Sequence, residues 1–420
     1  MAVPRRPRRA GNSLSFFYGI ATRLAEAGLQ LRNLVLPDDA WRERLVPPDA
    51  DIPRRPVWLH AASVGEVNSA RMLIDALAGD PGVLVTTNSL TGRATAREAG
   101  WPARLAPFDA PGATARFISR AQPSVQVTVE GEFWPNRARA LRAASVPQVV
   151  IGARMSERSA RRWSKMPGLI EPVLSGITAL SAQDAGSESR LIALGLDPNA
   201  LMGRMDLKLI GPAMVKPSDH GPDRDRTILA ASTHAGEEDI VIDAFTAARR
   251  DKPELRLILA PRHPERGDAV AGLLQARGLP VARRSLGATL DQAAPILLAD
   301  TLGEMALWYA AAGTCFTGGS LIDHGGHTPW EPAAHNCAIL HGPHVGNAAE
   351  AYDALDRAGA SHGVTAETLG FELSRLGGDS AATRRAGQLA RQVLDQRAGD
   401  PAPLLARIRA LARNRSRAHI

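Results

Sequence analysis

The sequence predicts an α/β protein with two successive doubly wound domains. Its 420 residues exceed what one hydrophobic core usually serves. From Val57 onward, short apolar runs alternate with helical patterns, which is typical of parallel sheets flanked by helices. Between residues 211 and 226 the alternation gives way to a stretch rich in Gly, Pro and charge, which indicates an interdomain linker.

The apolar runs predict the strands of each domain. In the first half they lie at residues 57–60, 83–87, 124–129, 148–151 and 177–181. Amphipathic stretches between them, such as 67–79 and 184–194, are predicted helices. In the second half the strands are expected at 227–232, 255–261, 295–300, 314–319 and 337–342, and 381–415 reads as helix. These assignments place the domains at 41–210 and 227–420, with the linker at 211–226 between them.

Composition narrows the class of protein. Apolar residues make up 45% and charged residues 22%, an ordinary globular mixture. The only cysteines are Cys315 and Cys337, which suits a reducing compartment and excludes a disulfide framework. The net charge of +7 implies an anionic partner, which is nucleic acid, an acidic membrane or a phosphorylated substrate. No nucleic-acid motif is found and aromatic residues are only 4%, so nucleic acid is the least favoured partner.

The first 40 residues differ from the rest of the chain. Arginines crowd the beginning, and the uncharged stretch that follows is far shorter than the ~20 residues needed to span a bilayer. Phe17, Ile20, Leu24 and Leu31 then recur near helical spacing. Residues 1–40 are therefore predicted to form a basic amphipathic helix. Its apolar face either lies on an anionic membrane surface or docks on the protein's own core.

Several predicted strands end in glycine and small polar residues at the entry to a helix. These segments are H-A-A-S-V-G-E at 60–66, S-T-H-A-G-E-E at 232–238, D-T-L-G-E at 300–304 and G-G-S-L-I-D-H-G-G-H-T-P-W-E at 318–331. Free backbone N–H groups and the helix dipole at such positions favour phosphate or carboxylate. Together, on two sheets, they predict a ligand site at the carboxyl ends of the strands.

The same loops carry segments that occur together in one enzyme family. They are S-V-G-E at 63–66, E-G-E-F-W-P-N at 130–136, A-R-M-S-E-R-S at 153–159, S-T-H-A-G-E-E at 232–238, P-R-H-P-E-R at 261–266, D-T-L-G-E at 300–304 and G-G-H-T-P-W-E-P-A-A at 325–334. In this order they resemble the 3-deoxy-D-manno-octulosonic acid (Kdo) transferases of lipid A biosynthesis, glycosyltransferase family 30. The resemblance spans residues from about 57 to 350.

The resemblance implies a fold, a reaction and a location. The fold is GT-B, in which two Rossmann-like doubly wound domains face a central cleft. The N-terminal domain, 41–210, would hold a lipid A precursor of the lipid IVA type, and the C-terminal domain, 227–420, would hold the donor CMP-Kdo. The reaction would be an inverting glycosyl transfer. No cofactor is expected, because CMP-Kdo is a substrate, and no metal is expected either. The protein would be peripheral, on the cytoplasmic face of the inner membrane.

Catalytic roles carry over where residues match. Glu66 matches the family's general base, and a sugar hydroxyl needs such a carboxylate to accept its proton. From the residues alone, Glu66 is equally an acid that favours a helix N-terminus. Glu130 matches a residue assigned to transition-state stabilisation, and Glu132 is a neighbour easily confused with it.

Donor contacts are expected in the second domain. Arg262 could neutralise the donor phosphate with its fork of N–H donors. The resemblance implies the following donor-binding residues: Ser232, Thr233, His234, Pro261, Arg262, Leu302, Gly303, Glu304, Thr328, Pro329, Trp330 and Glu331.

The sequence departs from the family at two places. Thr328 stands where the family usually has asparagine. In G-R-M-D-L-K at 203–208, the family's lysine position holds Asp206 and its aspartate position holds Lys208. We predict that Lys208 takes over the cationic role, on an extended segment that gives it one face with Asp206. The other interpretation is drift in a segment that no longer contacts substrate.

The sequence permits three further interpretations. Five histidines between His324 and His344 suggest a metal site, but they span a loop, a helix start and a strand, without H-E-x-x-H spacing. We therefore expect no metal. The Asp206/Lys208 exchange makes a catalytically silent, membrane-associated relative conceivable. A GT-B transferase with a changed donor or acceptor is the nearest alternative.

Overall fold

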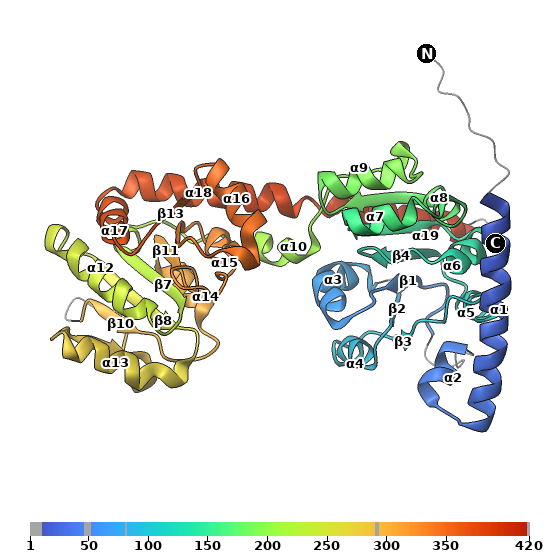
Figure 1. Ribbon diagram of the computed structural model, residues 1–420, viewed down its shortest axis with the longest axis horizontal. Helices are drawn as coiled ribbons and strands as arrows, with labels where there is room; N and C mark the ends of the chain where they lie inside the picture. The colour runs from blue at the N-terminus through green and yellow to red at the C-terminus, as the bar shows by residue number, and fades with distance from the viewer. Residues whose placement is uncertain (1–10, 46–51, 80–81, 290–293, 418–420) are drawn as a thin grey trace, which may run out of the picture. The chain divides into compact units, whose positions relative to one another are not determined.

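The computed structural model describes residues 11–45, 52–79, 82–289 and 294–417 (Figure 1). The chain divides into two compact units. The first unit consists of Met1–Ile210 and Ala398–Ile420, and the second of Gly211–Arg397. Each contains one parallel sheet covered by helices, so both the α/β class and the doubly wound architecture are confirmed.

The sheet of the first unit has the strand order β3-β2-β1-β4-β5-β6. The bounds are β1 (Val57–His60), β2 (Val83–Thr87), β3 (Ala103–Leu105), β4 (Val125–Val129), β5 (Gln148–Ala153) and β6 (Ile177–Ala182). Val57 pairs with Val83 on one side and with Val125 on the other. The strand order therefore reverses between β1 and β4.

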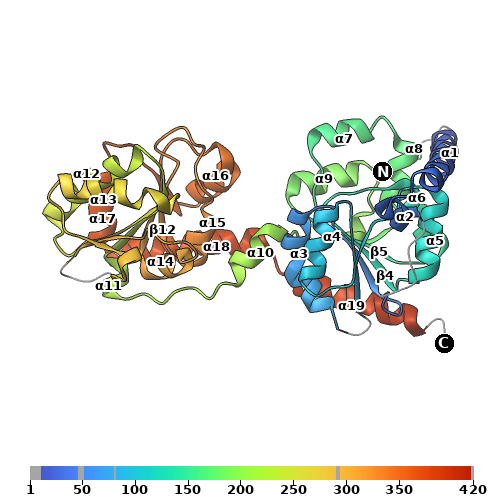
Figure 2. The same cartoon turned by 90° about the horizontal axis from the view of Figure 1, so that it is seen from below.

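Helices cover both faces of this sheet (Figure 2). They are α2 (Asp39–Leu45), α3 (Val64–Leu77), α4 (Leu90–Glu98), α5 (Pro111–Ala121), α6 (Pro135–Ala143), α7 (Glu157–Trp163), α8 (Pro167–Leu174), α9 (Ala185–Ala193) and α10 (Leu207–Met214). Side chains of α3, such as Ile74, pack with Leu59 and Val127 in one core cluster. Phe117 of α5 and Leu141 of α6 belong to another cluster. Because both faces are buried, the strands are continuous apolar runs, which explains why the sequence revealed them.

The end of the chain belongs to the first unit. The helical stretch predicted at 381–415 is two helices, α18 (Ser380–Ala398) and α19 (Ala402–Arg417). In α19, Leu404, Ile408 and Ala412 lie one turn apart and are buried in the core that contains α3. The sequence assigned everything after residue 227 to the second domain, whereas these contacts place Ala398–Ile420 in the first unit.

The second unit has the parallel strand order β13-β12-β11-β7-β8-β10-β9. Its strands are β7 (Thr227–Thr233), β8 (Arg256–Pro261), β9 (Val281–Arg283), β10 (Ile296–Leu298), β11 (Thr314–Thr317), β12 (Ala338–His341) and β13 (Ser361–Gly363). Its order reverses between β7 and β11. Its longer helices are α12 (Glu237–Asp251), α13 (Gly267–Ala276), α14 (Met305–Ala311), α16 (Ala349–Arg357), α17 (Leu369–Gly378) and, up to Arg397, α18.

The predicted linker is folded with the second unit. Residues 211–226 include the end of α10 and the short helix α11 (Pro222–Asp225). The carboxylate of Asp225 is fully buried and accepts hydrogen bonds from Arg384 at 2.6 and 2.9 Å. Arg391 donates to the carbonyl of Val215 at 2.7 Å. Arginines of α18 therefore hold this polar stretch in place.

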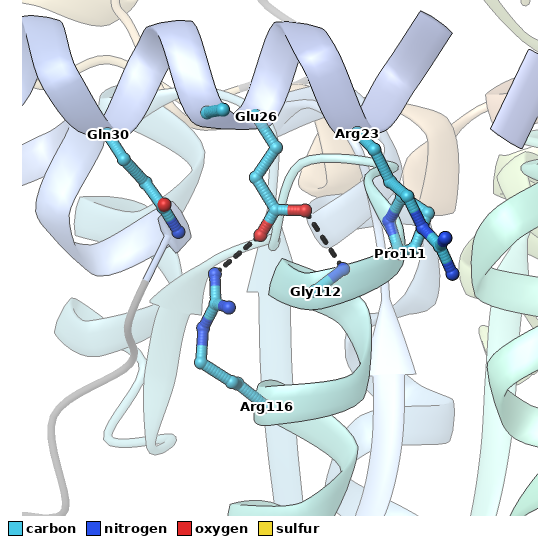
Figure 3. Close-up of a pocket in the computed structure, with 7 residues that line it drawn as sticks. Arg23, Glu26, Gln30, Pro111, Gly112 and Arg116 are labelled. Carbon is cyan, nitrogen blue, oxygen red and sulfur yellow. Dashed lines mark hydrogen bonds and ion pairs between the residues drawn. The ribbon is translucent and has the colours of Figure 1, made fainter. Parts of the chain in front are cut away.

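The N-terminal helix α1 (Gly11–Val35) docks through polar residues, on α5 and α8. Tyr18 donates to the carboxylate of Asp109 at 2.9 Å, and Thr22 accepts a hydrogen bond from Asn136 at 2.9 Å. One helical turn further on, Glu26 is buried. Figure 3 shows its carboxylate between the Arg116 guanidinium, at 2.6 Å, and the backbone N–H of Gly112, at 2.9 Å.

The apolar side chains of α1 face away from this contact. Phe16 and Phe17 are each 65% exposed, and Leu24 is 70% exposed. The possibility that the apolar face docks on the protein's core is therefore wrong, because the hydrogen-bonded stripe through Tyr18 and Glu26 occupies that position. None of the helices in the described residues is long and apolar enough to cross a membrane.

Candidate active site

The reversal between β1 and β4 brings together the acidic residues of the first unit. His60 ends β1 and pairs with Thr128 of β4. The loops that follow these two strands leave in different directions, because one leads to α3 and the other to α6. Such a switch point is where ligands bind in open α/β sheets. Glu66 follows β1, while Glu130 and Glu132 follow β4.

Glu66 lies in the first turn of α3. The Ser63 hydroxyl caps this helix by accepting the backbone N–H of Glu66 at 3.3 Å. In return, the Oε2 atom of Glu66 accepts the N–H of Ala62 at 2.7 Å, while Oε1 has only a long contact with the Ser63 hydroxyl at 3.4 Å. The helix-terminal role and the catalytic role are therefore compatible, since one carboxylate oxygen stays lightly engaged.

The surroundings make Glu66 a stronger base. Burial raises the pKa of Glu66, and the negative charges of Glu130 and Glu132 raise it further, against the hydrogen bonds from Ala62 and Ser63. A carboxylate with a raised pKa accepts a proton more readily at neutral pH. These electrostatic interactions also show that the structure brings Glu66 close to the acidic loop after β4.

Glu130 adopts a strained backbone conformation. Its φ of 58° lies in the left-handed region, which non-glycine residues seldom adopt. A side chain at the following residue, Gly131, is excluded, because a Cβ atom there would lie 2.7 Å from the Arg154 carbonyl oxygen. Within the described part of the chain, no hydrogen bond involves the Glu130 side chain. Backbone strain of this kind is concentrated at functional sites. Here it occurs at the first residue after β4, beside the switch point.

Two residues that the sequence did not single out are central to this site. Glu132 accepts hydrogen bonds from His60 at 2.7 Å, from Trp134 at 2.8 Å and from Asn88 at 2.9 Å. Burial disfavours its charge, but these donors prevail and lower the pKa of Glu132 to about 2. Burial also lowers the pKa of His60, to about 4, so the imidazole is neutral at pH 7. The sequence signal that could have indicated His60 is a polar residue at the end of the otherwise apolar run V-W-L-H.

The segment around Lys208 is not extended, as predicted, but begins α10. The Asp206 carboxylate accepts the backbone N–H of Lys208 at 3.1 Å, in the manner of a helix cap, and also the Gln183 amide at 3.1 Å. Among the described contacts no ion pair joins Asp206 and Lys208, so the predicted charge pair on one strand face is wrong. Capping of α10 explains an acidic residue at this position.

In the second unit, a buried carboxylate organises the Gly-rich loop after β11. Glu237, at the start of α12, accepts the backbone N–H groups of Gly319 at 2.6 Å, Ser320 at 3.0 Å and Leu321 at 2.9 Å. It also accepts the N–H of His234 at 3.1 Å. The loops after β7 and β11, on either side of the strand reversal, are thereby tied together.

A group of imidazoles lies at this reversal. The Nε2 atoms of His234 and His327 are 3.0 Å apart, and the His324 ring lies 4.2 Å from that of His234. Burial lowers the pKa of both His234 and His327, so they are mainly neutral at pH 7. The charge of Arg262, which is exposed just after β8, also lowers the pKa of His327.

The other predicted donor residues are placed less uniformly. Ser232 has a left-handed φ of 55°, whereas Thr233 is buried and its hydroxyl lies 3.3 Å from Glu238. Glu304 is ion-paired with Arg284 at 2.6 Å. Pro261 is the last residue of β8, and the remaining predicted residues follow β10 and β11 at the same carboxyl edge of the sheet; they are Leu302, Gly303, Thr328, Pro329, Trp330 and Glu331.

The histidines of the suspected metal cluster separate. His335 is 3.0 Å from the hydroxyl of Ser218, and His341 is 3.2 Å from Asp356. Only His324 and His327 join His234. Throughout the described ranges, no group of three or more His, Cys, Asp or Glu side chains could hold a metal ion. The expectation of a metal-independent reaction stays a prediction.

Two Rossmann-like units in one chain, each with polar loops at its switch point, are the architecture of the GT-B fold. Residues 39–210 match the family model described as 3-deoxy-D-manno-octulosonic-acid transferase (kdotransferase). The chain is 34% identical to the 3-deoxy-D-manno-octulosonic acid transferase of Haemophilus influenzae, over 72% of this chain and 74% of that protein. It is 35% identical to the Bordetella pertussis enzyme of the same name, over 73% and 75%.

A solved structure is also similar. The C-terminal CMP-Kdo binding domain of WaaA from Acinetobacter baumannii is 32% identical, covering 41% of this chain and 91% of that domain, with a TM-score of 0.39. The relatives in Haemophilus and Bordetella establish the assignment. The chain belongs to the family of 3-deoxy-D-manno-octulosonic acid transferases, and it is a glycosyltransferase of lipopolysaccharide biosynthesis.

Glu66→Gln is expected to lower the turnover of Kdo transfer by about 10²–10⁴-fold, because the amide cannot accept a proton. The near-isosteric change preserves the hydrogen bond to Ala62, so the fold should persist, as circular dichroism would verify. Glu98→Gln, at an exposed carboxylate of the same unit, is the matched control. Near-normal turnover of Glu66→Gln would remove Glu66 from the role of base.

Proposed function

We propose that this protein transfers Kdo from CMP-Kdo to a hydroxyl group of a lipid A precursor, with inversion at the anomeric carbon. The observation that supports this most directly is Glu66, a carboxylate of raised pKa with one lightly engaged oxygen at the switch point of the first sheet. As the acceptor oxygen bonds to the anomeric carbon, its proton passes to Glu66. The bond from that carbon to the CMP phosphate breaks, and CMP leaves with the electron pair.

The second unit is the proposed site of the donor. Arg262 is exposed at the carboxyl edge of its sheet, near His327, and can pair with the single phosphate of CMP. Neutral imidazoles, such as His234, can donate one hydrogen bond each. Preorganised donors of this kind stabilise a departing phosphate without a metal ion. The 32% identity to a domain that binds CMP-Kdo supports the same donor.

The proposed location is peripheral, on the cytoplasmic face of the inner membrane. The polar stripe of α1 is occupied by the contacts of Tyr18 and Glu26, and this leaves Phe16, Phe17 and Leu24 exposed. Arginines on the same helix, such as Arg23, supply positive charge. A helix with such a surface inserts its apolar side into the interface of an anionic bilayer, where a lipid acceptor resides.

Incubation of the purified protein with CMP-Kdo and a lipid A precursor of the lipid IVA type tests the reaction. The expected product is the precursor increased by the mass of one or more Kdo units, with CMP released. Transfer of a different sugar, or to a different acceptor, would replace the proposal by a transferase of changed specificity. No release of CMP with any lipid acceptor would favour a catalytically silent relative, as the Asp206/Lys208 exchange permits.

Membrane binding has a separate test. The double change Phe16→Ser with Phe17→Ser should reduce cosedimentation with anionic vesicles by at least about tenfold, because each buried Phe contributes roughly 1.5–3 kcal/mol. Binding should also weaken as salt rises, since the charge attraction acts over ~8 Å at physiological ionic strength. Phe371→Ser, at a comparably exposed residue of the second unit, is the control. Equal sedimentation of the double variant and the parent contradicts the proposed membrane contact.

We propose that Lys208 supplies the positive charge that the family has at the position of Asp206. It is exposed in the first turn of α10. Three residues earlier, Met205 donates its backbone N–H to the carbonyl of Ala182 at the carboxyl end of β6. This is the same edge of the sheet as Glu130. Lys208→Ala should lower turnover by about 10²–10³-fold if this charge stabilises the transition state. Lys165→Ala, another exposed lysine, should have no effect. Full activity of Lys208→Ala would show that other groups stabilise the transition state.

A further inference from the structure

A buried chain of hydrogen bonds runs beneath the active site of the first unit. The indole N–H of Trp58 donates to the hydroxyl of Thr86 at 2.8 Å, and this hydroxyl lies 3.0 Å from Nδ1 of His60. Nε2 of His60 lies 2.7 Å from the Glu132 carboxylate. The ionised Glu132 carboxylate can only accept, so Nε2 carries the proton; Nδ1 of the neutral imidazole is then the acceptor, and the Thr86 hydroxyl donates to it while accepting from Trp58. His60 is therefore held as the tautomer that donates its Nε2–H to Glu132.

Glu132 is kept ionised by this arrangement. Its Oε2 atom accepts from His60, Trp134 and Asn88, and its Oε1 atom accepts from Asn88. Donors that surround a carboxylate favour its charged form. Because Oε2 has three donors and Oε1 has the Asn88 amide, Glu132 is less suited than Glu66 to take a proton from a substrate. Glu132 is therefore a fixed negative charge, whereas Glu66 retains an oxygen for proton transfer.

A rigid connection sets the position of Glu132 relative to Glu66. Asn88 donates its backbone N–H to the carbonyl of Ala62 at 2.9 Å and its side-chain amide to Glu132 at 2.9 Å. Ala62 donates its own N–H to Glu66 at 2.7 Å. Through these two residues, hydrogen bonds connect the ends of β1 and β2 to both carboxylates.

The charged groups that face this pair come from several elements. Glu130 adds a second negative charge beside Glu66 from the loop after β4. The Arg137 guanidinium of α6 donates to the backbone carbonyl of Glu132 at 2.8 Å, and Arg44 of α2 donates to the carbonyl of Asn88. Both arginines interact with the charge of Glu132. They therefore reduce its field without removing it, and Glu66 still experiences net negative surroundings.

We propose that Glu132 is a positioning residue for the transfer reaction: a permanently ionised carboxylate, oriented by neutral His60, whose charge strengthens Glu66 as the base. The inference rests on the proposed function, in which Glu66 accepts the proton of the acceptor hydroxyl. It deepens that function by separating two roles among neighbouring carboxylates, since one accepts a proton while the other never does. Like charges close together raise proton affinity, and a fixed charge does so at every pH at which the enzyme works.

The pH dependence of kcat tests this in the full-length protein. As pH falls, Glu66 becomes protonated and the rate falls, and in the parent this occurs at a raised pH. Glu132→Gln removes the neighbouring charge, so the acid limb should move down by at least about half a pH unit. The rate at neutral pH should drop severalfold, because a weaker base accepts the proton less readily. KM should change little, because the proposed role of Glu132 acts through the basicity of Glu66.

Three further variants separate charge from structure. Glu132→Asp retains the charge and should keep the acid limb near its parental position. Trp134→Phe removes one donor but leaves Glu132 ionised, so its acid limb should also remain in place. Glu98→Gln, at an exposed carboxylate of α4, controls for loss of a remote charge. An unchanged acid limb in Glu132→Gln, or the same shift in Trp134→Phe, would overturn the proposal.

A measurement without substrate keeps the inference independent of the assay. Carbon-13 NMR of glutamate-labelled protein follows the Glu66 carboxyl directly, and Glu66→Gln identifies its signal. The titration midpoint of Glu66 should be lower in Glu132→Gln than in the parent, by about the shift expected in the rate profile. An equal midpoint in both proteins overturns the inference. Failure of the proposed reaction, in contrast, would appear as absent Kdo transfer with the shifted midpoint intact.

Discussion

The reversal of strand order within each parallel sheet is the constraint on which the sites depend. In the first unit, the chain adds β2 and β3 on one side of β1 and then returns to place β4 on the other side. The loops after β1 and β4 must therefore diverge, and the carboxyl edge is open between them. Glu66 follows β1 in the first turn of α3, and Glu132 lies on the loop after β4. The second unit repeats the arrangement at β7 and β11, where Glu237 and His234 lie.

The central strands could be predicted because burial on both faces leaves nothing but apolar runs. The strands that the sequence did not reveal, β3, β9 and β13, are three-residue strands at sheet edges, too short to give such a run. The spacing of apolar residues predicted the helix α1 but not which of its faces docks on the protein. That docking depends on hydrogen bonds of Tyr18 and Glu26 to partners about 90 positions away. No local pattern encodes such partners.

Some residues of the candidate active site could likewise be predicted from the sequence, and others could not. Glu66 and Glu130 were predicted from short motifs whose residue types and order identify a family, although a left-handed φ at Glu130 could not be read from them. His60 and Glu132 were given no role from the sequence, because their importance arises from a contact between β1 and the loop after β4. For the segment around Lys208, the sequence analysis predicted a conformation that is wrong. The sequence predicted an extended segment, but Asp206 is a good capping residue, and capping starts a helix there.

Transfer of an acidic sugar makes conflicting electrostatic demands on an enzyme. A carboxylate base gains strength from neighbouring negative charge, as Glu66 does from Glu130 and Glu132. A donor with a phosphate and a sugar carboxylate requires positive or neutral hydrogen-bond donors, such as Arg262 and His234. One switch point cannot meet both demands, because cations that bind the donor would weaken the base. Two sheets supply two switch points, so this chain can keep acidic groups on one and donors on the other. On this view the second Rossmann-like unit separates the base from the groups that bind the donor, besides providing more binding surface.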